Sequence, residues 1–206
     1  MVVVIRCELT ASQTTARRKN DAVWLLRFAA DNLTDTEIDE CADLAPRVAL
    51  RYAASRLTPE RVDACAAKEP ADALRHAASR LTPGRLDQCA GRRQRCALEY
   101  AAALLTPDRL DWLAERDIWG ALTHAAALLT PDRLDWLAEQ HPHAALGYAA
   151  ALLTPERLDW CATEQPESAL RDAAHLITRD RLERCAAAKP WALREIAVLA
   201  ARSRNP

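Results

Sequence analysis

The chain repeats itself every 24 residues, seven times in succession, with no insertion or deletion. The tripeptide Leu-Thr-Pro marks the repeat and begins at Leu57, Leu81, Leu105, Leu129 and Leu153, while diverged copies begin at Leu33 and Ile177. A fixed period of about 20–50 residues is typical of stacked supersecondary units. The period therefore predicts a repeat architecture, in which each position can be compared across seven copies.

One copy predicts two helices joined by a sharp corner. Leu146, Ala149 and Leu153 follow the i, i+3, i+7 spacing of one helical face. Thr154 fits the N-cap of a second helix and Pro155 its first position, where no amide hydrogen is needed. We expect a first helix of about ten residues and a second of about eight, which is marginal for an isolated helix. Such helices are stable only when neighbouring repeats stack.

The columns of the repeat also set the expected organisation of the chain. We expect a degenerate N-terminal cap over residues 1–20 and seven helical repeats over 21–189. Residues 190–206 should form a C-terminal cap, with a helix over 192–201 and a tail. The predicted fold class is thus an all-α solenoid of two-helix repeats with atypical ends.

The pattern Ala49-Leu50-Arg51-Tyr52-Ala53-Ala54, followed by Leu57-Thr58-Pro59 and Cys65-Ala66, resembles the leucine-rich repeat variants over about residues 21–201. That family shares the 24-residue period and the proline near the corner. The resemblance implies a right-handed superhelix, but no single activity. In the family the second segment can be a 3₁₀ helix, whereas here it is long enough for an α-helix. The family's cysteine-rich iron–sulfur segment does not carry over, because only Cys7 lies near the N-terminus.

Composition and cysteine placement indicate a cytoplasmic protein. The net charge of −1 exerts no general attraction on nucleic acids or membranes. No apolar run approaches the roughly 18 residues that span a bilayer, so we expect no membrane contact. Five of the seven cysteines share one column with Leu113 and Leu137, namely Cys41, Cys65, Cys89, Cys161 and Cys185. A column that accepts Leu or Cys predicts buried, reduced thiols.

Two columns are more aromatic than a stacked core requires. The tyrosine–histidine column of the first helix contains Tyr52, His76, Tyr100, His124 and Tyr148, and Arg51 and Arg75 precede its first two members. The tryptophan column of the second helix contains Trp112, Trp136 and Trp160, where other repeats have Glu40, Ala64, Gln88 and Arg184. Either the tryptophans form an exposed patch for a partner or each indole seals the gap to the next repeat.

A charged ladder has a structural interpretation. Arg61, Arg109, Arg133 and their equivalents each stand two residues before an acid, as in Arg133 and Asp135. We expect an Arg of one repeat to pair with an acid of the next, which helps to set the register of the repeats.

No motif for catalysis, metal or cofactor stands out, so we expect no enzyme, no cofactor and no small-molecule ligand. His76 and His124 lie two repeats apart, about 20 Å by the usual spacing of packed helices, and could not share a metal. His141 and His143 at a corner, and Asp172 beside His175, are weak metal signals that surface placement explains better.

The expected function is a non-catalytic, protein-binding scaffold or inhibitor that engages its partner through the outward aromatic columns. The alternative is RNA or single-stranded DNA binding, since aromatics interleaved with Arg51, Arg75 and the corner residues Arg92, Arg93 and Arg95 suit stacking on bases. Against it, residues 1–103 carry a net charge of only +2.

Overall fold

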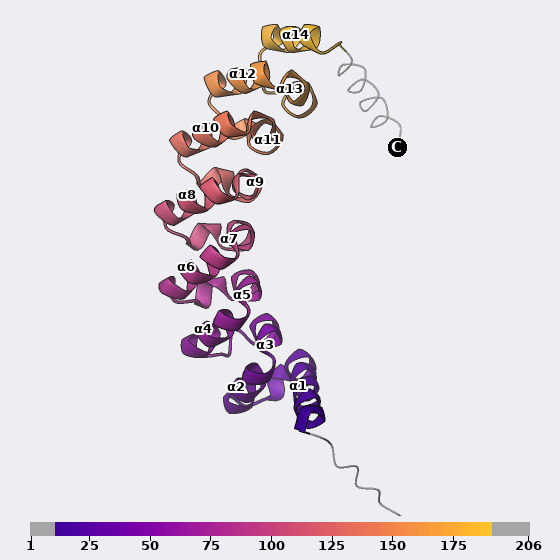
Figure 1. Ribbon diagram of the computed structural model, residues 1–206, viewed down its shortest axis with the longest axis vertical. Helices are drawn as coiled ribbons and strands as arrows, with labels where there is room; N and C mark the ends of the chain where they lie inside the picture. Colours follow the sequence, from indigo (N-terminus) through magenta and orange to yellow (C-terminus); the bar gives the residue numbers. More distant parts are fainter. Residues whose placement is uncertain (1–10, 191–206) are drawn as a thin grey trace, which may run out of the picture. The chain divides into compact units, whose positions relative to one another are not determined.

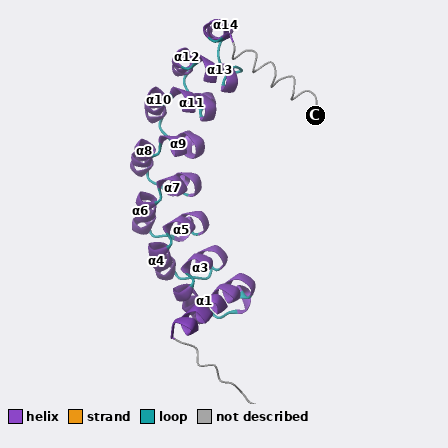
Figure 2. Ribbon diagram, turned by 45° about the vertical axis from the view of Figure 1, so that its right-hand side comes forward, coloured by secondary structure: helices purple, strands orange, loops and turns teal. Residues whose placement is uncertain are grey.

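The computed structural model describes residues 11–190, and every regular element within that range is helical. The chain divides into two compact units, Met1–Leu104 (unit 1) and Leu105–Pro206 (unit 2). Both units are built from the same alternation of helices, with short loops between them (Figure 2).

Unit 1 contains two layers of helices. One layer consists of α1 (Ala11–Phe28), α3 (Pro46–Tyr52), α5 (Pro70–His76) and α7 (Gln94–Tyr100), which pack in sequence order. The other consists of α2 (Asp35–Leu44), α4 (Pro59–Lys68) and α6 (Pro83–Arg92) (Figure 1). Short 3₁₀ turns η1 (Ala30–Asn32), η2 (Ala78–Arg80) and η3 (Ala102–Leu104) follow helices of the first layer.

Unit 2 repeats this plan. Its first layer consists of α9 (Ile118–Gly120) with the π-helical turn η4 (Ala121–Ala125), then α11 (Pro142–Tyr148) and α13 (Pro166–Asp172). Its second layer consists of α8 (Pro107–Arg116), α10 (Pro131–Gln140), α12 (Pro155–Glu164) and α14 (Arg179–Ala188). Along the chain, the 3₁₀ turn η5 (Ala126–Leu128) precedes α10, and η6 (Ala150–Leu152) precedes α12.

The second helices begin as the sequence predicts, at a threonine cap. The side chain of Thr154 accepts a hydrogen bond from the Arg157 amide, and Pro155 occupies the first turn. The same cap recurs at Thr34, Thr58, Thr82, Thr106, Thr130 and Thr178. In α2, which has no proline, Glu37 completes a capping box with Thr34, and these hydrogen bonds lower the pKa of Glu37.

The predicted helix lengths are wrong in both directions. The first helix spans seven residues and ends at Tyr148, because Ala149 leaves the helical region at φ −132° and ψ 8° and a 3₁₀ turn follows. The second helix spans ten residues rather than eight, and its α-helical type is confirmed. Over only four residues, apolar spacing does not distinguish a 3₁₀ turn from another α-helical turn, so Leu153 is buried as predicted although the helix has ended.

After α1, the first helices α7 and α9 both begin without a proline. Helix α7 has no side-chain cap, whereas Asp117 caps α9 and its carboxylate accepts a hydrogen bond from the Gly120 amide at 2.9 Å. A Cβ atom at Gly120 would collide with that carboxylate. Glycine at this position therefore allows Asp117 to replace the usual start of the helix.

The core follows the predicted columns. The first-helix leucines are buried in all seven repeats, at Leu26, Leu50, Leu74, Leu98, Leu122, Leu146 and Leu170. The five column cysteines are buried free thiols, and the Cys185 Sγ lies 3.3 Å from the Ala162 carbonyl oxygen of the preceding repeat. Burial raises the pKa of each, that of Cys161 to about 11.

The ends of the chain bear on the expected caps. Helix α1 is continuous across residue 20, where the N-terminal cap was expected to end. Residues 1–10, with Cys7, and the expected helix 192–201 and its tail lie outside the described residues.

Candidate functional site

The tryptophan column lies on the second layer of unit 2, with one indole on each of α8, α10 and α12. Trp136 and Trp160 are 36% and 37% exposed, and Trp112 is half-buried. In each helix an arginine one turn earlier stacks on the indole: Arg109 lies 4.1 Å from the ring centre of Trp112, and Arg133 and Arg157 lie 5.2 Å from their rings. One face of each indole is therefore covered from within the helix, while a third of the side chain of Trp136 and Trp160 meets solvent.

The stacked arginines also join neighbouring repeats. Arg133 lies 3.5 Å from Asp111 and 2.9 Å from Glu115, both on the preceding second helix. Arg157 contacts Asp135 and Glu139 in the same way. Pairing between repeats is confirmed, but its direction is opposite to the prediction, because the acids lie in the preceding repeat.

The sequence interpretation missed the second acid of each pair. The first turn of one second helix lies beside the middle and end of the preceding one, so Arg133 and Arg157 each reach two carboxylates rather than one. The i, i+4 spacing of Asp111 and Glu115, repeated at Asp135 and Glu139, was the available signal.

The tyrosine–histidine column faces outward on the first layer of both units. Its members Tyr52, His76, Tyr100, His124 and Tyr148 are all exposed. In unit 1 the neighbouring arginines are exposed too and stack on these rings, Arg51 at 5.3 Å from the Tyr52 centre and Arg75 at 4.7 Å from the Tyr100 centre.

The surroundings of this column shift the pKa of two of its members in unit 1, His76 and Tyr100. Partial burial, and then Arg51, Arg75 and Arg47, lower the pKa of His76, and Asp72 opposes them. A hydrogen bond with Glu99 raises the pKa of Tyr100. Helices α1, α3, α5 and α7 together carry eight Arg and Lys against three Asp and Glu. The first layer of unit 1 therefore combines an excess of basic side chains with exposed aromatic rings.

A further aromatic cluster lies in unit 2. The Trp119 ring centre is 4.9 Å from that of His143 and 6.0 Å from that of Tyr148, with both pairs edge to face. All three side chains are exposed. The sequence interpretation did not single out Trp119, although it occupies the same repeat position as His143, one repeat earlier.

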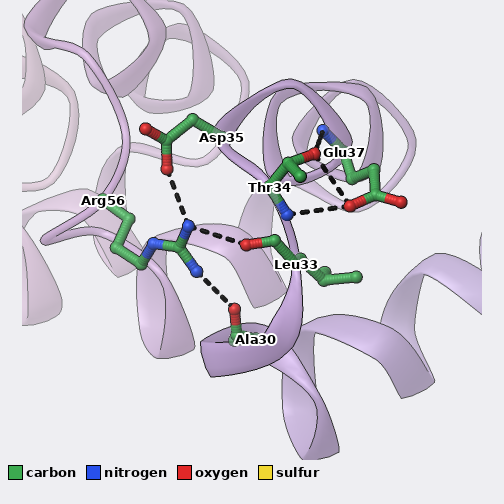
Figure 3. Close-up of polar contacts among 6 residues, drawn as sticks. All are labelled: Ala30, Leu33, Thr34, Asp35, Glu37 and Arg56. Atoms are coloured by element: carbon green, nitrogen blue, oxygen red, sulfur yellow. Dashed lines mark hydrogen bonds and ion pairs between the residues drawn. The ribbon is translucent and has the colours of Figure 1, made fainter.

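The sequence interpretation also missed a column that lies shortly after the end of the first helix of each repeat, at the position of Arg56 and Arg80. In unit 1, Arg56 donates hydrogen bonds to the carbonyl oxygens of Ala30 at 2.6 Å and Leu33 at 2.7 Å, and it pairs with Asp35 at 2.7 Å (Figure 3). Arg80 donates likewise to the Leu57 carbonyl at 2.8 Å. The same position contains Leu104 at the end of unit 1, 48% exposed, and Leu128, Leu152 and Leu176 in unit 2, which are 49%, 48% and 37% exposed.

The predicted basic corner is partly engaged in the fold. Arg92 donates to the Ala67 carbonyl at 3.0 Å. A shallow hollow beside it is lined by Lys68, Glu69, Arg92 and Arg93 among others, so both charge signs meet there.

Two classes of site have no representative in the described structure. Within residues 11–190, no three His, Cys, Asp or Glu side chains lie close enough to hold a metal ion. No helix of that range combines the length and the apolar character needed to cross a bilayer.

Comparisons of the chain with protein-family models, with curated proteins and with solved structures found no match. The resemblance to the leucine-rich repeat variants therefore stays a prediction from the sequence.

Proposed function

We propose that this protein is a non-catalytic binding scaffold or inhibitor that holds a protein partner through its tryptophan column. The supporting observation is the exposure of Trp136 and Trp160 at a position where packing does not require an indole. Unit 1 builds the same layer with Glu40, Ala64 and Gln88 at this position. Because Trp is the residue most enriched in the energetic centres of protein interfaces, a partner is the best reason for three in succession.

The proposal includes the architecture expected from the period. Repeats that each pack on their sequence neighbours would continue into a right-handed α-solenoid, whose stacked helices present an extended surface to a macromolecule. The partner would be a cytoplasmic protein, and binding would need no cofactor.

The test is affinity capture from the native host followed by mass spectrometry. The bait is the full chain, compared with a triple variant in which Trp112, Trp136 and Trp160 become Gln, the residue already present at position 88. We expect recovery of the partner to fall by about 30-fold or more, as for a typical interface hot spot. A comparison variant replaces Tyr100, His124 and Tyr148 with Ala. If both variants stay helical by circular dichroism and both retain the partner, the proposal is wrong.

A second candidate function is supported by the first layer of unit 1. The stacked pairs Arg51–Tyr52 and Arg75–Tyr100, on helices with five more basic than acidic residues, combine phosphate-binding charge with rings on which bases stack. We expect labelled single-stranded RNA to bind with an affinity that falls steeply with salt, and to be weakened by Arg51→Gln with Arg75→Gln. Absence of any anisotropy change at low salt would eliminate this candidate.

A further inference from the structure

The tryptophan column lies on an acidic surface. Helices α8, α10 and α12 carry nine Asp and Glu side chains against four Arg. The chain as a whole is nearly neutral, with a net charge of −1, so this excess is local. Trp136 and Trp160, the most exposed indoles of the column, thus lie on helices whose charged side chains are mostly acidic.

The arginines of this surface are already engaged. Arg133 and Arg157 each contact two carboxylates of the preceding helix and also stack on a tryptophan. Arg116 stacks on Trp112 at 3.8 Å and donates to the Trp112 carbonyl oxygen. An acidic partner would have to compete with these contacts, several of which join one repeat to the next.

Three carboxylates remain open beside the column. Asp108, Asp132 and Glu156 each stand four residues before a tryptophan, which places them next to it on the helix surface. All three are exposed, and within residues 11–190 none forms an ion pair. The repeats of Trp136 and Trp160 therefore each offer a partly exposed indole and an unpaired negative charge side by side, whereas two arginines stack on Trp112.

We propose that this surface binds an extended, basic segment of the partner protein. A Lys or Arg of that segment would lie over the indole face that Arg133 or Arg157 does not cover, close to the adjacent carboxylate, because the ring face and the negative charge both attract a cation. The charges of Arg133 and Arg157 are balanced by their own acids, so they do not repel the incoming cation at full strength. The inference rests on the proposed function and names the chemical class of the partner.

Repeat spacing limits the pattern of basic residues. Packed helices lie about 8–10 Å apart, and an extended chain advances about 3.3 Å per residue. Successive indole–carboxylate pairs therefore match cations at about every third residue of the partner segment.

The test measures binding of synthetic labelled peptides to the full chain by fluorescence anisotropy. The probe is a fluorescein-labelled peptide with Arg at every third residue and Gly-Ser between. One comparison peptide carries Glu in place of Arg, and another carries the same Arg residues consecutively. We expect binding of the spaced Arg peptide, weaker binding of the consecutive one and none of the Glu peptide.

Neutralising the carboxylates separates charge recognition from simple contact. A variant with Asp108→Asn, Asp132→Asn and Glu156→Gln should weaken the spaced peptide by about tenfold or more, because each site loses one attractive charge pair. Glu60→Gln is the matched control, since Glu60 occupies the same helix position in α4 but has Ala64 where the others have Trp. It should leave the affinity unchanged.

Several outcomes would overturn the inference. They are equal binding of the Glu peptide, an unchanged affinity in the neutralised variant, and a salt-sensitive association of the chain with itself that excludes the peptide. If no basic peptide binds while the tryptophan variant still loses its captured partner, the inference fails and the proposed function stands. If the basic peptide binds but Trp→Gln changes neither peptide binding nor capture, the proposed function itself fails.

Discussion

In unit 1, Arg56 and Arg80 occupy the position at which unit 2 has Leu152 and Leu176. Arg56 crosses to the preceding repeat and binds two of its carbonyl oxygens, whereas Leu152 is 48% exposed. The same contrast holds at the tryptophan column, which is Ala64 or Gln88 in unit 1 and an indole in unit 2. Yet the buried columns are alike in both units. Packing within each unit therefore tolerates wide variation at these two surface columns, where an arginine or a small or polar residue in one repeat is replaced by a partly exposed leucine or tryptophan in another.

The largest expected effects test whether the two cores are equivalent. Leu50→Ala in unit 1 and Leu146→Ala in unit 2 each empty a buried leucine site, and each should lower the free energy of unfolding by about 2–5 kcal/mol. Urea unfolding followed by circular dichroism gives the overall loss, and hydrogen exchange with mass spectrometry assigns it to a unit. Leu152→Ala, at an exposed position, should change stability by less than about 0.5 kcal/mol. A large difference between the two core variants would show that the units do not share one packing scheme.

Exchanging the Arg and Leu of the contrasting column should have a smaller effect. Arg56→Leu removes hydrogen bonds to Ala30 and Leu33 and should destabilise unit 1 by about 1–3 kcal/mol. The reverse change, Leu152→Arg, places a guanidinium near the equivalent carbonyls of Ala126 and Leu129 and should stabilise unit 2 by up to about 1 kcal/mol. Urea midpoints measure both. If Leu152→Arg destabilises the protein, the exposed leucine has a packing role that the comparison of units does not reveal.

Sequence periodicity predicts more of the core than of the surface. The leucine and cysteine columns, the threonine caps and the α-helical second segment follow from seven aligned copies, because a buried position restricts the residue in every repeat. The end of the first helix at Tyr148 could not be predicted in this way, since Leu153 would be buried whether the chain continued as an α-helix or formed the 3₁₀ turn. Local spacing alone could not predict the helix lengths.

Surface contacts were predictable only where they stay within one repeat. The stacking of Arg157 on Trp160 follows from their separation by one turn. The choice of Glu139 as the partner of Arg157, and the reach of Arg56 to Ala30, depend on how one helix lies beside the preceding one. That offset is a tertiary property, and single columns do not contain it.

The buried thiols should make the stability of the protein depend on pH in the alkaline range. The pKa of Cys161 is raised from the ordinary 9.0 to about 11, so the folded state keeps its proton in a range where the unfolded chain loses it. The contribution of this thiol to stability should therefore be constant below pH 9.0 and be lost as the pH rises toward about 11. Cys161→Leu, which copies Leu137 of the same column, should weaken this fall in unit 2. Thermal unfolding across that pH range measures it, and an unchanged profile in the variant would assign the fall to other groups.

The smallest expected effect separates the two roles of the arginine ladder. Arg157→Gln breaks contacts with Asp135 and Glu139 and uncovers one face of Trp160, while Arg61→Gln breaks contacts with Asp39 and Asp43 beside Ala64. Since both arginines are partly exposed, each change should cost about 0–1 kcal/mol, and less at high salt. Only Arg157→Gln should shift indole emission to longer wavelength, with Trp160→Gln identifying the signal. If emission is unchanged while stability falls, the arginine joins repeats but does not shield the indole, and Trp160 is more open to a partner than its stacking indicates.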